Sequence, residues 1–183
     1  MNTNSTQLPW DALRHKEGDI PWDALRTFSE AVVHDPEVVG GLFDLYAETH
    51  KTALTDVSYG DLYVPAVFAL AAPHLDDGQR RRIGAFLLDK LVVAGQEDDD
   101  LALELLTAAA GTMGPMILPD ALDAIDAETD PHGAWGFLWS LTLLAAHTED
   151  ADLRQRVVQA CARLLERVER NEVEDWEGTN AAW

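Results

Sequence analysis

Apolar residues recur at helical spacing along nearly the whole of this 183-residue sequence. From Pro21 onward, Leu25, Phe28 and Val32 follow one another at intervals of three or four residues, which places them on one face of a helix. No segment shows the strict alternation and β-branched enrichment that a strand requires. The sequence therefore predicts an all-α fold.

Short acidic and proline-containing segments mark the ends of the predicted helices. Asp35-Pro36-Glu37, for example, combines an N-cap acid, a first-turn proline and a second acid near the positive end of the helix dipole. The predicted helices cover residues 21–34, 36–52, 61–72, 80–92, 101–112, 116–127, 132–147 and 151–170.

The later helices are predicted to form pairs that begin near residues 61, 99 and 131. The resulting spacings of 38 and 32 residues are typical of two-helix repeats. We therefore predict a HEAT-like solenoid of antiparallel helix pairs, in which the segment 61–72 pairs with 80–92. An irregular helical bundle is the alternative, because the repeats share no consensus sequence.

A chain of this length can bury a core without disulfides or metals. We expect residues 1–170 to form a single helical-repeat domain with a short N-terminal capping turn, and residues 171–183 to form an acidic C-terminal tail.

The hexapeptide PWDALR occurs twice, at residues 9–14 and 21–26. In the second copy, the proline and the acid suit the first turn of a full helix. The first copy is soon followed by Gly18, so it predicts only a short helical turn. Two interpretations remain open. Either the two turns cap the exposed end of the repeat array, or Trp10 and Trp22 form a recognition patch, since tryptophan is a common anchor of protein interfaces.

The net charge of −20, from 33 acidic and 13 basic residues, restricts the choice of partners. Nucleic acids and anionic membranes are bound through Lys and Arg, so we expect neither as a partner. The acidity indicates either a contribution to solubility or a function, which is to bind a basic partner protein or to mimic a nucleic acid and so block a protein that binds one. Cys161 is the single cysteine, so an intrachain disulfide is excluded. The sequence has neither a signal-like start nor a long apolar run, which predicts a cytoplasmic protein.

Motifs of common enzymes are missing from the sequence. It contains no GxxxxGK[ST], GxGxxG, GxSxG, HExxH or CxxC pattern. The six histidines are scattered, with none three or four residues from another. We therefore predict a protein that is not an enzyme, with no catalytic residues, no metal site and no cofactor.

Two helical segments carry candidate binding residues. Trp135 and Trp139 lie one helical turn apart, either in the core or lining a groove for a partner or an apolar ligand. Asp120 and Asp123 also share a helix face, which is either a solvated surface or a carboxylate pair suited to general acid–base chemistry.

The C-terminal segment is acidic and contains Trp176 and the terminal Trp183. This composition is typical of an interaction tail, and a frayed terminus is the alternative. We include both tryptophans among the candidate partner-binding residues.

The order of the helices resembles that of the HEAT-like helical repeat proteins and, more narrowly, of an uncharacterised bacterial family built from such helices. The resemblance rests on residues 18–25, 34–39, 118–125 and 130–146 and covers roughly residues 18–170. It implies a helical-repeat fold and an interaction scaffold. Some HEAT-like relatives are bilin lyases or DNA glycosylases, but no functional residue of either can be carried over, and the Cys-rich zinc motif of some family members is absent here.

Three functions follow as hypotheses. The first is a protein–protein interaction scaffold or adaptor, and the second is an acidic inhibitor or immunity-type protein that binds a basic enzyme. The third is a small-molecule-binding protein or an enzyme that uses a groove lined by the Trp135/Trp139 pair and the Asp120/Asp123 face.

Overall fold

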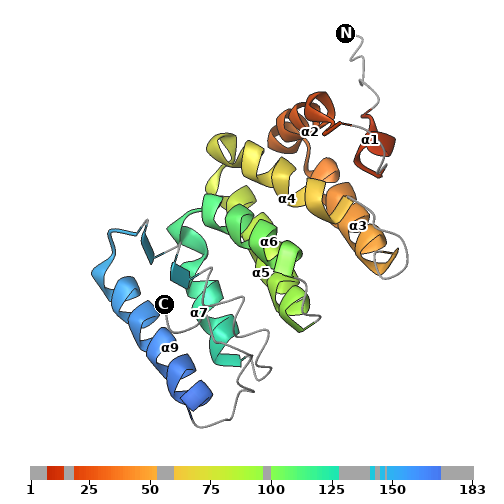
Figure 1. Cartoon of the computed structure of the whole chain (residues 1–183). Helices are drawn as coiled ribbons and strands as arrows, with labels where there is room; N and C mark the ends of the chain where they lie inside the picture. Colours follow the sequence, from red (N-terminus) through yellow and green to blue (C-terminus); the bar gives the residue numbers. More distant parts are fainter. Residues whose placement is uncertain are drawn as a thin grey trace. The chain divides into compact units, whose positions relative to one another are not determined.

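A computed structural model describes residues 8–14, 19–52, 60–96, 100–127, 141–142, 145–146 and 148–169. Every regular element in these ranges is helical, so the all-α prediction is confirmed (Figure 1). The chain divides into two compact units, Met1–Leu75 and Asp76–Trp183.

The first unit is built around α4, which packs against both α2 and α3. A short helix, α1, contacts α2 and α4. The helices of this unit are α1 (Trp10–Arg14), α2 (Trp22–His34), α3 (Pro36–Thr52), α4 (Gly60–Ala71) and the 3₁₀ turn η1 (Ala72–His74). Its largest fully buried side chains are Leu13, Leu25, Phe28, Leu42, Leu45, Tyr46 and Phe68.

One residue, Asp35, both ends α2 and begins α3. Its backbone N–H donates to the carbonyl oxygen of Ala31 at 2.9 Å, which closes the last turn of α2. Its carboxylate accepts the backbone N–H of Glu37 at 2.9 Å, as an N-cap does. The helix start predicted from Asp35-Pro36-Glu37 is therefore confirmed, and both helices end within one residue of their predicted limits.

In the second unit, α5 packs along α6 and against η2, while α7 packs against α9. The elements are α5 (Asp77–Gln96), α6 (Asp100–Thr112), the 3₁₀ turn η2 (Pro115–Ile117), α7 (Leu118–Ala127) and α9 (Ala151–Glu169). The fully buried side chains that they share include Ile83, Leu87, Leu91, Leu106, Ile117 and Leu118.

Side-chain caps begin two helices of this unit. Asp76 and Gln79 form a capping box, in which the Gln79 N–H donates to the Asp76 carboxylate at 2.8 Å and the Asp76 N–H donates to the Gln79 side-chain oxygen at 3.0 Å. The Asp150 carboxylate accepts the N–H groups of Asp152 and Leu153 at 2.9 and 3.1 Å. These caps satisfy donors that have no partner within the first turn of a helix.

Two glycines allow η2 to lie close to α5. Gly114 has φ = 84°, a left-handed conformation that favours glycine, and it turns the chain from α6 into η2. A β-carbon built on Gly84 of α5 would lie 2.5 Å from Cγ2 of Ile117, so the native contact requires the hydrogen of glycine.

The predicted pair of helices 61–72 and 80–92 spans both units. Within the first unit α4 packs with α2 and α3, and within the second α5 packs with α6. The pairing of 61–72 with 80–92 stays a prediction. Most of the predicted helix 132–147 lies outside the described residues.

No single helix in the described part of the chain is both long and apolar enough to cross a membrane. The segments 104–112 and 115–123 reach the required length and composition together, but the chain bends by 106° between them.

Candidate interaction site at the second hexapeptide

The first PWDALR copy is packed into its unit through its tryptophan. The rings of Trp10 and Phe28 meet edge to face, with centroids 4.7 Å apart and an interplanar angle of 66°. On α3, a β-carbon built on Gly41 would lie 2.7 Å from Cη2 of Trp10. Leu13 of the same copy is fully buried. Apolar contacts with α2 and a close approach to α3 therefore hold α1 in place.

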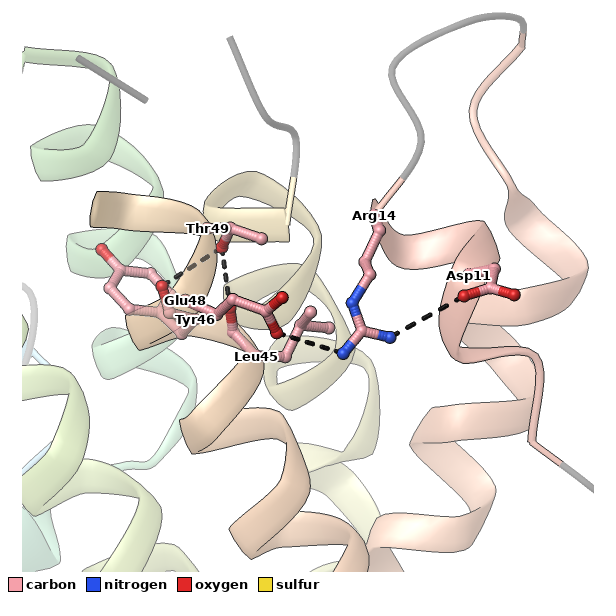
Figure 2. Close-up of polar contacts among 6 residues, drawn as sticks. All are labelled: Asp11, Arg14, Leu45, Tyr46, Glu48 and Thr49. Atoms are coloured by element: carbon pink, nitrogen blue, oxygen red, sulfur yellow. Dashed lines mark hydrogen bonds and ion pairs between the residues drawn. The ribbon is translucent and has the colours of Figure 1, made fainter. Parts of the chain in front are cut away.

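Arg14 adds polar contacts at the end of the first copy. Figure 2 shows its guanidinium donating to the carboxylate of Glu48 at 3.1 Å and lying 3.9 Å from that of Asp11. Both carboxylates are largely exposed, so each pair contributes at most about 1 kcal/mol. The same view shows the buried hydroxyl of Thr49 donating to two carbonyls of its own helix at 2.9 and 3.1 Å. The apolar packing of Trp10 and Leu13 therefore contributes more to holding α1 than these exposed ion pairs do.

Replacing Gly41 with alanine should loosen α1. The new methyl group would overlap the Trp10 ring, and overpacking of this kind costs about 1–3 kcal/mol, partly offset by the better helix propensity of alanine. We expect faster trypsin cleavage after Arg14. In a Trp10→Ala background the methyl group meets no ring, so Gly41→Ala should add no further increase in the cleavage rate. An unchanged cleavage rate in the single variant would contradict this account of the contact.

The second copy leaves its tryptophan exposed. Ala24 and Leu25 are buried in the core of the unit, but Trp22 is 54 % exposed and the preceding Ile20 is 50 % exposed. The same hexapeptide therefore lies in two different environments. In the first copy the tryptophan packs inside its unit, and in the second the indole ring is exposed at the start of α2. Trp22 therefore stays a candidate for the predicted recognition patch, whereas Trp10 is a packing residue.

Exposed charged residues flank Trp22 in the sequence. Asp19 and Asp23 lie within three residues of it, and Arg26 and Glu30 follow at helical spacing along α2. We call these six residues, Asp19, Ile20, Trp22, Asp23, Arg26 and Glu30, the Trp22 surface. Three carboxylates and one guanidinium give it a net negative charge.

The candidate residues predicted from sequence have different outcomes. Asp120 is exposed in the first turn of α7. Asp123 lies on the same helix, and its carboxylate is 3.6 Å from the guanidinium of Arg156 on α9. This exposed ion pair joins two packed helices and gives Asp123 a structural contact. The remaining candidates, Trp135, Trp139, Trp176 and Trp183, lie outside the described residues.

Ile20 was missed by the sequence analysis. It lies before the periodic stripe of α2, so it does not contribute to the pattern that marks the helix. One signal in the sequence could have found it. Ile20 is an apolar residue next to Pro21 and outside the helical stripe, so the pattern gave no reason to expect it in the core.

Cys161 is half-buried on α9, and desolvation raises the pKa of its thiol, although a backbone hydrogen bond opposes the shift. No group of three or more His, Cys, Asp or Glu side chains within the described ranges is placed to hold a metal ion.

We expect Cys161 to react slowly with iodoacetamide near neutral pH. The thiolate is the reactive form, and a raised pKa lowers its population in the folded chain. Because ionisation is disfavoured in the fold, the stability linked to this group should be lost as the pH rises through the folded pKa. The alkylation rate of the folded chain should be severalfold below that in denaturant. Equal rates would contradict the prediction.

Comparison with known proteins adds no family to this description. No protein-family model, curated protein or solved structure matches the chain.

Proposed function

We propose that this chain is a protein-binding adaptor of the cytoplasm that engages a partner through an exposed apolar anchor. The observation that carries the proposal is the exposure of Ile20 and Trp22 at the start of α2, in a fold that packs the other PWDALR tryptophan against Phe28. Partly exposed tryptophans are frequent energetic anchors of protein interfaces. A HEAT-like arrangement of the helices, which we also propose, would offer an extended surface around such an anchor.

The charge of the chain favours a basic partner. A net charge of −20 attracts basic proteins over long distances and raises their association rate at low salt. The same observation supports a second candidate function, an acidic inhibitor or immunity-type protein that covers the basic surface of an enzyme. The adaptor and the inhibitor differ in whether the bound partner keeps its activity.

The adaptor proposal is tested by affinity capture from the extract of the source cells at ~50 mM and ~500 mM salt, a range over which screening changes strongly. The bait proteins are the unchanged chain, the double variant Ile20→Ser/Trp22→Ser and a control variant, Leu101→Ser/Val158→Ser. Leu101 and Val158 are a matched pair because they are 54 % and 62 % exposed on other helices.

We expect one stoichiometric partner that the unchanged chain and the control capture and that the Ile20→Ser/Trp22→Ser variant loses. Inhibition of the partner by stoichiometric amounts of the chain would favour the inhibitor function over the adaptor. Capture that does not depend on Ile20 and Trp22 would move the interaction to another surface. If no bait captured a partner at either salt concentration, the protein-binding proposal would be wrong.

A further inference from the structure

We propose that the Trp22 surface binds a basic segment of a partner protein, in which an apolar side chain is flanked by Lys or Arg. This inference rests on the proposed protein-binding function and specifies the chemistry of the partner. The apolar side chain would contact Ile20 and Trp22, and the flanking cations would pair with the carboxylates of the Trp22 surface.

The aromatic ring makes this site different from the other exposed apolar positions. Among the described residues, the large exposed apolar side chains are those of Ile20, Trp22, Leu70, Leu101 and Val158. Trp22 is the aromatic member of this set, and the face of an indole ring attracts a Lys or Arg cation. Ile20, two residues earlier, adds exposed apolar area, so an anchor and a cation-binding face occur together.

The charges near Trp22 in the sequence select the sign of the partner. Asp19 and Asp23 lie within three residues of Trp22, Glu30 follows at helical spacing along α2, and Arg26 is the one cation of the Trp22 surface. Two cations of a bound segment could therefore meet two carboxylates while one of them also lies over the indole. An acidic segment would meet repulsion from three carboxylates.

A second copy of this chain fits the surface poorly. Each copy has a net charge of −20, and the Trp22 surface is itself negative, so a symmetric contact would bring like charges together. The charge thus favours a basic partner over self-association.

The inference is tested with a library of short random peptides selected on the immobilised full-length chain. Counter-selection uses the full-length Ile20→Ser/Trp22→Ser variant, which should keep its helical circular dichroism and unfolding midpoint because both side chains are exposed. We expect the enriched peptides to carry Lys or Arg on both sides of an apolar residue. Their Kd for the double variant should be about tenfold higher, or more, than for the unchanged chain.

Further variants separate the contributions of the ring, the apolar area and the charge. Trp22→Phe keeps an aromatic face and should retain more affinity than Trp22→Leu, which keeps apolar area alone. Asp19→Asn/Asp23→Asn should weaken binding at ~50 mM salt and reduce its salt dependence. The control variant Leu101→Ser/Val158→Ser should bind with unchanged Kd.

Peptides that bind the unchanged chain and the Ile20→Ser/Trp22→Ser variant equally would overturn the assignment of the Trp22 surface but leave a protein-binding function intact. Enrichment of neutral or acidic peptides would overturn the basic-segment inference alone. Concentration-dependent dimerisation that Trp22→Ser abolishes would identify a second copy as the occupant and would also overturn it. A library that yields no binder would overturn the inference, and the capture experiment would then decide the proposed function separately.

Discussion

Replacing Phe28 with alanine should destabilise the first unit by about 3–5 kcal/mol, the range typical of a large aromatic side chain removed from a core. Phe28 is fully buried on α2, so the substitution leaves a cavity between packed helices. The same ring is the edge-to-face partner of Trp10 at 4.7 Å, so α1 would lose its aromatic contact as well. We expect the midpoint of denaturant unfolding to fall, with a matching increase in amide hydrogen exchange.

The location of the exchange makes this test specific. Protection should fall in α2, α3 and α4, whose side chains share the core with Phe28, and α1 should exchange fastest because it loses its anchor. Phe86→Ala offers a matched control, since Phe86 is a half-buried phenylalanine on α5 and its removal leaves a smaller void. Similar losses of stability in the two variants would show that Phe28 is not the centre of this core.

Much of the helix order could be predicted because its signals are local. Asp35 lies between two helices and caps the second through a hydrogen bond to Glu37, a contact that spans two residues and is visible in the sequence as Asp-Pro-Glu. The apolar stripe of α2, from Leu25 to Val32, likewise depends only on helical spacing.

The choice of packing partners could not be predicted in this way. An apolar stripe shows that a helix has a buried face, but it does not show which other helix covers that face. In the first unit α4 meets α2 and α3, and in the second α5 meets α6, although the apolar stripes alone do not distinguish these partners from other helices. These contacts depend on long-range fit, such as the close approach of Gly84 to Ile117, which periodicity does not encode.

The candidate site shows the same limit at the level of single residues. Trp10 and Trp22 occupy the same position in identical hexapeptides, so no local rule could assign one to a packed position and the other to an exposed one. In the structure α1 ends at Arg14 and its tryptophan lies against Phe28, whereas the second copy continues into α2 with its tryptophan 54 % exposed. Likewise, the helix face shared by Asp120 and Asp123 gave no sign of the ion pair with Arg156.

The contact between α5 and η2 predicts that Gly84→Ala destabilises the unchanged chain but stabilises a chain that already carries Ile117→Ala. In the unchanged chain, Gly84→Ala places a methyl group 2.5 Å from Cγ2 and 3.3 Å from Cδ1 of Ile117. Ile117 is fully buried and follows the left-handed turn at Gly114, so it has little room to move. Overpacking costs about 1–3 kcal/mol, near its upper end here, and the helix propensity of alanine returns about 1 kcal/mol, for a net loss of about 2 kcal/mol.

In an Ile117→Ala background the same Gly84→Ala substitution should instead stabilise the second unit. Ile117→Ala alone should cost about 2–5 kcal/mol, because it removes a fully buried side chain. It also removes the Cγ2 and Cδ1 atoms that the new methyl group would meet. The Cβ atom of residue 117 remains 3.3 Å from that methyl group, but the cavity gives it room for the small shift that this tight contact requires, so the gain in helix propensity should exceed the remaining cost. Denaturant unfolding of the four proteins in this double-mutant cycle measures the coupling directly. If Gly84→Ala destabilised both backgrounds equally, the two residues would not be in contact, and the packing of η2 against α5 would need another explanation.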